Sequence, residues 1–272
     1  MKEFSAHQLK YYLSLKNKLN PLCTRTPNSV DYWHPSDTEE RFIDNVKKYS
    51  NSVHIKNYLK VPIKYEYNNY GFRTPDDFNL KNIGNIFLGC SHTFGIGHHL
   101  ENTWSYKLSQ KIGGKFYNIS EPGSGIMTQY RYLKYFADKI TFKNVFHFLP
   151  EECWARYEYY LDGNFDFLHS APESLHVTKY GNFMLDVLYN ENQYMHNVFV
   201  HIDAIKNICK EYGSNYYIIT NSHMTKIDAY SKSLTPARDI EHYYVEDHEN
   251  IYQQFYKKYI NKNTSNTNRT II

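Results

Sequence analysis

The stretch IFLGCSHTFGIG at residues 86–97 passes directly from an apolar run into small and polar residues. A continuous apolar run that ends at glycine is typical of a strand buried on both faces of a parallel sheet. Ligands of such sheets bind beyond the carboxyl ends of the strands. The pattern therefore predicts a strand at 83–88 and places Ser91 at the ligand-binding edge of a sheet.

The rest of the chain repeats this rhythm of short apolar runs and longer amphipathic stretches. Apolar runs predict strands at 116–119, 145–149 and 216–220. Amphipathic stretches predict helices at 104–111, 127–139, 195–212 and 247–259. Strands that alternate with helices form a parallel sheet covered on both faces. The predicted fold class is therefore α/β, a three-layer α/β/α sandwich with a doubly wound, mainly parallel sheet.

The regions around this pattern predict the domain organisation. Residues 1–66 contain several prolines and are expected to form an accessory segment before a main domain at 67–260. Residues 150–190 are aromatic-rich without periodicity, which predicts an insertion near the ligand-binding edge. The Asn- and Thr-rich end, 261–272, is expected to be poorly ordered.

One local feature of the accessory segment can be predicted in more detail. Residues 38–49 have a helical pattern, and the preceding residues include side chains suited to capping a helix. Either Ser36 or Asp37 is the expected N-cap.

Composition excludes several function classes. The 31 basic and 28 acidic residues give a net charge of only +3, which argues against nucleic-acid binding. The four cysteines lie more than fifty residues apart, so no CxxC pair is present and reduced thiols are expected. No export signal or membrane-length apolar run is visible, so a cytoplasmic protein without a membrane partner is expected. The Asn- and Tyr-rich composition fits an AT-rich genome, such as that of a virus.

Ser91 needs a base before its hydroxyl can act as a nucleophile at neutral pH. The stretch ARDIEH at 237–242 offers one, because a single loop presents Asp239 and His242 together. Asp239 is expected to hold the Nδ1 proton of His242, which leaves Nε2 to accept the proton of Ser91. The stretch YNISEPGSG at 117–125 follows the second strand and offers backbone N–H groups for an oxyanion.

These three segments together resemble the SGNH (GDSL-like) serine hydrolases. The resemblance lies in the order Gly-x-Ser, Asn-x-x-x-x-Gly and a late Asp-x-x-His, and it spans about residues 68–259. Similar flanks in one esterase-like branch match NYGFR at 69–73, the glycines Gly95 and Gly97, and Trp104 with Leu108.

The resemblance implies the flavodoxin-like SGNH hydrolase fold and an esterase or deacylase. Ser91 would form an acyl-enzyme, with His242 as base and Asp239 as its orienting group. The N–H groups of Ser91 and Gly123 would form the oxyanion hole. No cofactor or metal is implied, and the expected substrate is a small-molecule or carbohydrate ester, for example an O-acetyl sugar.

Two positions depart from the family pattern. Cys90 stands where the family commonly has Asp, and FLPEE at 148–152 stands where Gly-x-Asn-Asp is usual. The second departure removes an oxyanion donor, a loss that costs about 100- to 1000-fold in rate. Asn221, which follows the last strand, is the candidate replacement donor.

Other readings of the same residues stay open. The chain could be an SGNH-fold binding protein without efficient chemistry, or an O-acyltransferase that uses the same serine. Cys90 is an alternative nucleophile, and His92, His98 and His99 suggest a metal cluster, although their spacing is unsuited to one. Candidate substrate-binding residues are Arg73, His92 and Arg238, with ordinary ion pairing as the alternative for both arginines.

Overall fold

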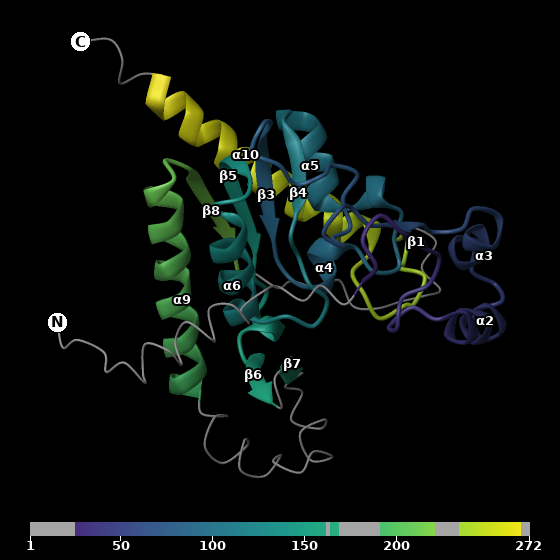
Figure 1. Cartoon of the computed structure of the whole chain (residues 1–272). Helices are drawn as coiled ribbons and strands as arrows, with labels where there is room; N and C mark the ends of the chain where they lie inside the picture. The colour runs from purple at the N-terminus through teal and green to yellow at the C-terminus, as the bar shows by residue number, and fades with distance from the viewer. Residues whose placement is uncertain (1–24, 162–163, 169–190, 221–233, 268–272) are drawn as a thin grey trace.

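The computed structural model describes residues 25–161, 164–168, 191–220 and 234–267. Its centre is a four-stranded sheet in the order β4-β3-β5-β8, with every neighbouring pair parallel (Figure 1). These strands are β3 (Ile83–Leu88), β4 (Lys115–Asn118), β5 (Thr141–Phe148) and β8 (Asn215–Ile219). Each overlaps a predicted strand, so the parallel sheet is confirmed, although β5 begins earlier than expected.

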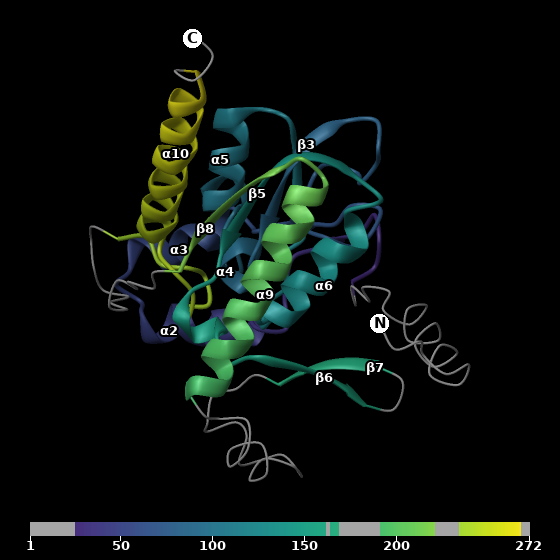
Figure 2. The ribbon, with the colours of Figure 1, turned by 90° about the vertical axis from the view of Figure 1, so that its left-hand side faces the viewer.

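Helices cover both faces of this sheet. One face carries α6 and α9, and the other carries α5 and α10 (Figures 1 and 2). Their bounds are α5 (Trp104–Ile112), α6 (Ile126–Phe136), α9 (Glu191–Glu211) and α10 (Val245–Thr267). The mixed α/β architecture predicted from the sequence is thus confirmed, with helices on either side of a parallel sheet.

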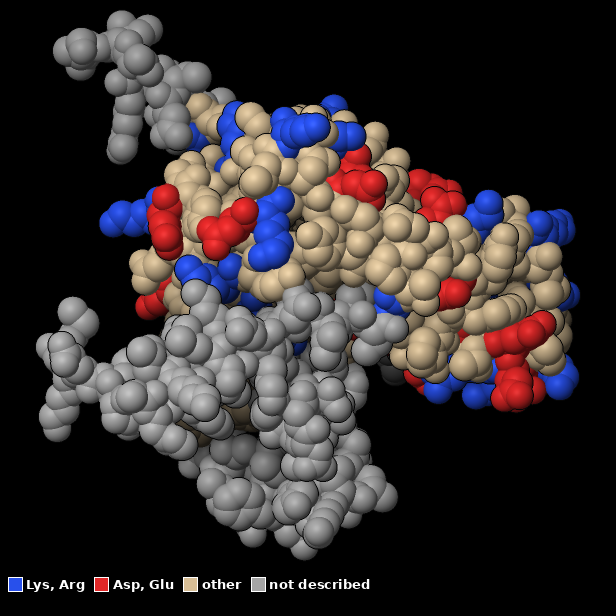
Figure 3. Space-filling model, viewed as in Figure 1, with Lys and Arg blue, Asp and Glu red and all other residues tan. Residues whose placement is uncertain are grey.

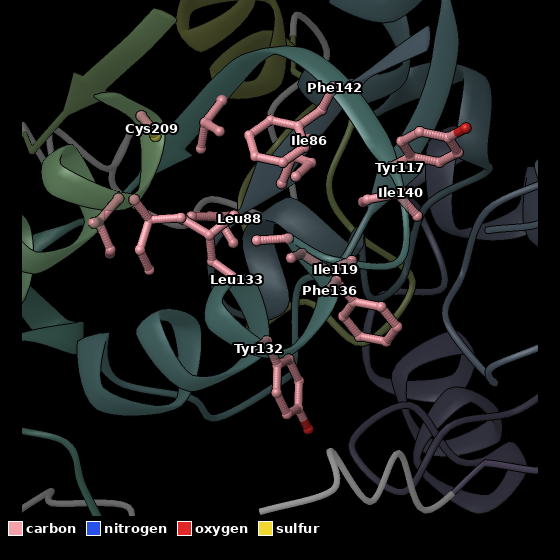
Figure 4. Close-up of a cluster of buried hydrophobic side chains, with 14 of the residues drawn as sticks. Ile86, Leu88, Tyr117, Ile119, Tyr132, Leu133, Phe136, Ile140, Phe142 and Cys209 are labelled. Atoms are coloured by element: carbon pink, nitrogen blue, oxygen red, sulfur yellow. The ribbon is translucent and has the colours of Figure 1, made fainter. Parts of the chain in front are cut away.

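Successive residues of each strand supply the two separate cores. Ile86 and Leu88 of β3 pack with Leu133 and Phe136 of α6 (Figure 4). Phe87, between them in the sequence, packs on the opposite face against Trp104 of α5. All six side chains are fully buried. Because strand side chains point alternately to the two faces, an unbroken apolar run is what a doubly covered strand requires.

The N-terminal segment, residues 25–66, packs onto the main domain. It contains α2 (Glu39–Lys48), α3 (Val53–Lys60) and the antiparallel pair β1 (Val30–Asp31) and β2 (Tyr65–Glu66). Its apolar side chains share a core with four residues of the main domain, Tyr67, Phe94, Ile96 and Ile240.

The cap predicted for the first helix is wrong. The N-cap of α2 is Thr38, whose hydroxyl accepts a hydrogen bond from the Arg41 N–H at 3.2 Å. Asp37 is instead buried and bonded to Arg238. A tertiary ion pair therefore takes the carboxylate that local capping rules would have used.

Two further expectations can be compared with the structure. The predicted insertion at 150–190 begins with η2 (Glu151–Cys153) and an antiparallel hairpin of β6 (Tyr157–Leu161) and β7 (Asn164–Leu168), and residues 169–190 lie outside the described ranges. α10 continues to Thr267, into the segment from residue 261 that was expected to be poorly ordered, and residues 268–272 lie outside the described ranges. Extending an existing helix is far easier than nucleating one, so the packed part of α10 carries its polar end.

The described part of the face drawn in Figure 3 has no large region of a single charge. Figure 3 shows basic and acidic side chains interspersed among uncharged ones, in keeping with the net charge of +3. Within the described ranges, no helix has both the length and the apolar composition needed to cross a membrane.

Candidate active site

Ser91 begins the short helix α4 (Ser91–Phe94), which follows β3 almost directly. Cys90 occupies the N-cap position in an extended conformation, and Gly95 ends the helix with a φ of +83°. Ser91 is only 7% exposed. The junction between strand and helix thus holds Ser91 at the carboxyl edge of the sheet, where ligands of parallel sheets bind.

Asp239 and His242 form a hydrogen-bonded pair. The Nδ1 atom of His242 lies 2.5 Å from Oδ2 of Asp239, while Oδ1 of Asp239 accepts from the Glu241 N–H at 3.2 Å. Burial lowers the pKa of His242, but the charge and hydrogen bond of Asp239 outweigh it, so that pKa is raised. Burial also raises the pKa of Asp239, and the opposing charge of His242 leaves it lowered overall. The ionised carboxylate therefore favours a proton on Nδ1 and leaves Nε2 free to act as a base.

His242 lies beside the helix that Ser91 begins. Its ring centroid is 5.3 Å from that of His92, the residue after Ser91. The charge of Cys90, the residue before Ser91, also raises the pKa of His242. Ser91 Oγ makes no hydrogen bond to another residue in the described ranges. Catalytic hydrogen bonds are often long until substrate binds, so this geometry is compatible with a base acting on Ser91.

The loop after β4 is tied to the loop that leads to Ser91. The Glu121 N–H and the Ser124 hydroxyl both donate to the Gly89 carbonyl, each at 3.2 Å. Gly123 lies between them with a φ of +79°, a conformation that favours glycine. Within the described ranges, no residue accepts a hydrogen bond from the Gly123 N–H. This backbone donor is therefore available near the nucleophile loop.

A buried hydrogen-bond chain supports the same two loops. The His147 ring lies 2.7 Å from the Tyr216 hydroxyl through Nδ1 and 2.6 Å from Gln129 Oε1 through Nε2. Gln129 Nε2 donates to Ser124 Oγ at 3.3 Å, and Ser124 in turn donates to Gly89. Burial lowers the pKa of His147 to about 3, so its ring is neutral. A neutral imidazole accepts a hydrogen bond at one nitrogen and donates one from the other. The chain connects the sheet interior to the nucleophile loop.

Glu152 occupies the loop after β5, where the resemblance expects an asparagine. Its Oε1 atom lies 3.1 Å from Nε2 of His92 and accepts from the Tyr243 hydroxyl at 3.2 Å. The His92 ring stacks on Tyr243 with centroids 3.7 Å apart. Burial raises the pKa of Glu152, but the hydrogen bond and charge of His92 lower it overall. A carboxylate thus stands near the site where a neutral amide donor is usual.

Two arginines predicted to bind substrate are buried structural residues instead. Arg73 donates to the carbonyls of Gly95 at 2.5 Å and His98 at 2.7 Å. Arg238 forms an ion pair with Asp37 in which both side chains are nearly inaccessible. Their predicted role at the mouth of the site is therefore corrected, because both guanidinium groups are used inside the protein. His92 lies beside His242, but it is also buried, and its Nδ1 atom has no hydrogen-bond partner among the described residues.

The structure favours Ser91 over Cys90 as the candidate nucleophile. Cys90 is fully buried, and the hydrogen bond with Cys153 lowers its pKa against the effect of burial. Cys153 Sγ also accepts a hydrogen bond from Arg156 Nη1 at 3.2 Å. A thiol enclosed in this way cannot meet a substrate, whereas Ser91 retains some exposure. Asn221, the candidate replacement donor, lies outside the described residues.

The remaining histidines of the nucleophile segment have protein partners. His98 Nε2 lies 2.6 Å from the Tyr243 carbonyl, and its ring packs edge-on against His248 at 4.9 Å. His99 stacks on Tyr58. In the part of the chain that the structure describes, no three His, Cys, Asp or Glu side chains are arranged to hold a metal ion.

Three residues near the candidate site carried no functional signal in the sequence. Glu152 was visible only as a departure from the family pattern, while Gln129 and His147 fell within an ordinary helix and strand. A polar residue inside an apolar strand, such as His147, is the signal that could have drawn attention to a buried network. Comparisons of this chain with protein-family models, curated proteins and solved structures found no match.

Proposed function

We propose that this chain is a serine hydrolase of the SGNH type that cleaves esters through an acyl-enzyme on Ser91. The observation that carries the proposal is the 2.5 Å hydrogen bond between Asp239 and His242, in a loop that lies against the helix begun by Ser91. A carboxylate that orients an imidazole beside a serine is the arrangement that activates a weak nucleophile. The parallel sheet, with Ser91 at its carboxyl edge, supports the SGNH version of the α/β fold.

In the proposed reaction, Ser91 Oγ attacks the ester carbonyl while His242 Nε2 accepts the hydroxyl proton. The backbone N–H groups of Ser91 and Gly123 stabilise the oxyanion, with Asn221 as the proposed additional donor. The tetrahedral species collapses, the ester C–O bond breaks, and His242 donates its proton to the leaving alcohol. Water then attacks the acyl-enzyme with His242 again as base, which releases the acid and restores Ser91. The proposed substrate class is a carbohydrate O-acetyl ester.

Glu152 favours a second candidate, a protein that keeps the fold for binding and lacks efficient chemistry. Its lowered pKa keeps the carboxylate charged, and a negative charge near a developing oxyanion opposes its formation. This candidate predicts an unreactive Ser91. The hydrolase predicts a reactive one.

A fluorophosphonate probe distinguishes the two candidates, because it reacts covalently with activated serines. The hydrolase should be labelled with one probe per chain, and Ser91→Ala should abolish labelling. Ser109→Ala is the matched control, since Ser109 is a buried serine of α5 whose hydroxyl has no hydrogen-bond partner within the described ranges. An unlabelled wild-type protein would support the binding protein, and labelling that persists in Ser91→Ala would reject Ser91 as nucleophile.

Substrate turnover then distinguishes hydrolysis from acyl transfer. With p-nitrophenyl acetate, a hydrolase releases acetate at the rate at which it releases p-nitrophenol. A transferase would instead move the acetyl group to an added sugar or alcohol acceptor.

Gly97 provides a test of how closely the His242 loop must approach α4. Its φ is +73°, and a Cβ at this position would lie 2.9 Å from Ala237 Cβ and 3.1 Å from Asp239 Oδ1. We expect Gly97→Ala to displace Asp239 and to slow fluorophosphonate labelling about 100-fold, as small misplacements of catalytic groups do. The measurement is the second-order labelling rate.

Gly113→Ala is the control for Gly97→Ala. Gly113 has a similar φ of +75°, but nothing lies within 4 Å of the added Cβ. Both variants place an L-residue at positive φ, which costs on the order of 1–3 kcal/mol. Equal labelling rates for the two variants would contradict a role for close packing at Gly97.

A further inference from the structure

The loop that carries Asp239 and His242 is anchored by a buried ion pair with the N-terminal segment. Arg238, directly before Asp239, donates through Nε to Asp37 at 3.0 Å and through Nη2 at 2.6 Å. Both side chains are 2% exposed or less. The guanidinium group also lies 4.0 Å above the ring of Trp33. This contact joins residues 201 positions apart in the sequence.

A second set of hydrogen bonds closes a circuit through the nucleophile segment. The Tyr65 hydroxyl donates to Asp37 Oδ2 at 2.6 Å and accepts from the Gly97 N–H at 3.0 Å. The Gly97 carbonyl accepts from the Arg238 N–H at 2.9 Å. Asp37 and Tyr65 therefore contact both the loop before His242 and the turn after α4, and they fix one relative to the other.

Two more side chains of the N-terminal segment bond to the backbone of the same loop. The Tyr58 hydroxyl donates to the Pro236 carbonyl at 2.9 Å, and Asn45 Nδ2 donates to the Arg238 carbonyl at 3.3 Å. The backbone of residues 236–238, immediately before Asp239, is thus hydrogen-bonded both to the N-terminal segment and to Gly97.

A buried ion pair is weak evidence for stability, because the cost of removing two charges from water can exceed their attraction. An apolar pair of similar size would pack the two segments together equally well. What apolar residues lack is direction, since several hydrogen bonds to one guanidinium group define its position and that of the adjoining backbone. The hydrogen bonds of Arg238 therefore do more than attach the N-terminal segment, because they also fix the position of the adjoining Asp239.

We propose that the N-terminal segment positions the catalytic acid–base pair, with Asp37 and Tyr65 as positioning residues that act through Arg238 and Gly97. The catalytic meaning of this proposal rests on the proposed function. The placement of His242 by the segment does not, because it can be measured on the imidazole itself.

The test uses the double variant Asp37→Asn/Arg238→Met in the full chain. It removes both charges together, so neither is left buried and unpaired. We expect a folded protein in which labelling by the fluorophosphonate is about 100-fold slower. We also expect the His242 titration midpoint, followed by NMR of the imidazole, to shift to lower pH because Asp239 is no longer held against the ring.

Several titratable groups besides Asp239 lie near His242, and the double variant leaves them unchanged. They are His34, Cys90, His92, His98, Glu241 and His248. A shifted midpoint therefore reports on Asp239. Lys47→Ala is the control within the same segment, because it breaks the exposed pair with Asp44 and should leave both readouts unchanged.

Tyr65→Phe tests the positioning role if the double variant does not fold. It keeps the ion pair and removes only the hydroxyl that joins Asp37 to Gly97, and we expect about tenfold slower labelling with a lower His242 midpoint. A folded variant with the wild-type midpoint and labelling rate would overturn the proposal. A wild-type protein that is never labelled would refute the proposed function, while the His242 midpoints would still decide the positioning role.

Discussion

Replacing His242 with alanine is expected to slow fluorophosphonate labelling of Ser91 by about 100- to 10,000-fold, the usual contribution of a positioned general base. The physical reason is that Ser91 would have no group to accept its proton. The second-order labelling rate at pH 8 measures the effect. His196→Ala is the control, because His196 is an exposed histidine of α9. A His242→Ala variant labelled at the wild-type rate would reject the base.

The pH profile of labelling tests the same pair without removing the imidazole. Labelling requires neutral His242, so the rate should fall as pH decreases through the pKa of His242, which Asp239 raises above its ordinary value. In Asp239→Asn the largest contributions that oppose burial, the carboxylate charge and its hydrogen bond, are lost or weakened, so the pKa of His242 falls. The midpoint of the profile should therefore move to lower pH, while the plateau rate falls because the ring loses its orientation.

Replacing Trp104 with alanine is expected to lower the free energy of unfolding by about 3–5 kcal/mol, the range for large buried aromatic residues. Trp104 is fully buried between α5 and the sheet. Its ring stacks on Phe255 of α10 with centroids 4.7 Å apart and meets the edge of Phe87 at 5.7 Å. Alanine would leave a cavity between α5, α10 and β3, and the sheet and its two helices cannot move together far enough to fill it.

Urea denaturation measures this change, and two variants calibrate it. Trp104→Phe retains most of the ring volume and removes an indole N–H that no described residue accepts, so it should cost less than Trp104→Ala. Phe199→Ala removes a side chain that is 58% exposed and should change stability by less than about 0.5 kcal/mol. A loss below about 1 kcal/mol for Trp104→Ala would mean that this core is not packed as described.

The strands and helices of the main domain could be predicted because their signals are local. The strand at 83–88 ends in the unbroken apolar run 86–88, and burial on both faces demands that pattern. The candidate residues Ser91, Asp239 and His242 could be proposed because each lies at a recognisable transition after a strand or before a helix. The Asp239–His242 contact followed from their spacing in one loop.

Residues that act through long-range contacts could not be found in this way. Asp37 has the sequence context of a helix cap, yet its partner Arg238 lies 201 positions away. Arg73 and Arg238 looked like surface cations, and only the packing of the N-terminal segment makes them interior ones. Nothing in the local sequence around either arginine indicates which carbonyl or carboxylate it will meet.

The sequence by itself therefore determined the parallel sheet and the small set of residues from which a nucleophile and its base can be proposed. Only the tertiary structure decided that an apparently accessory segment packs against the Asp239–His242 loop, and that Glu152 stands near His92. The reason is physical. Hydrophobic periodicity depends on neighbours a few positions away, whereas ion pairs and hydrogen bonds between distant segments depend on how the whole chain packs.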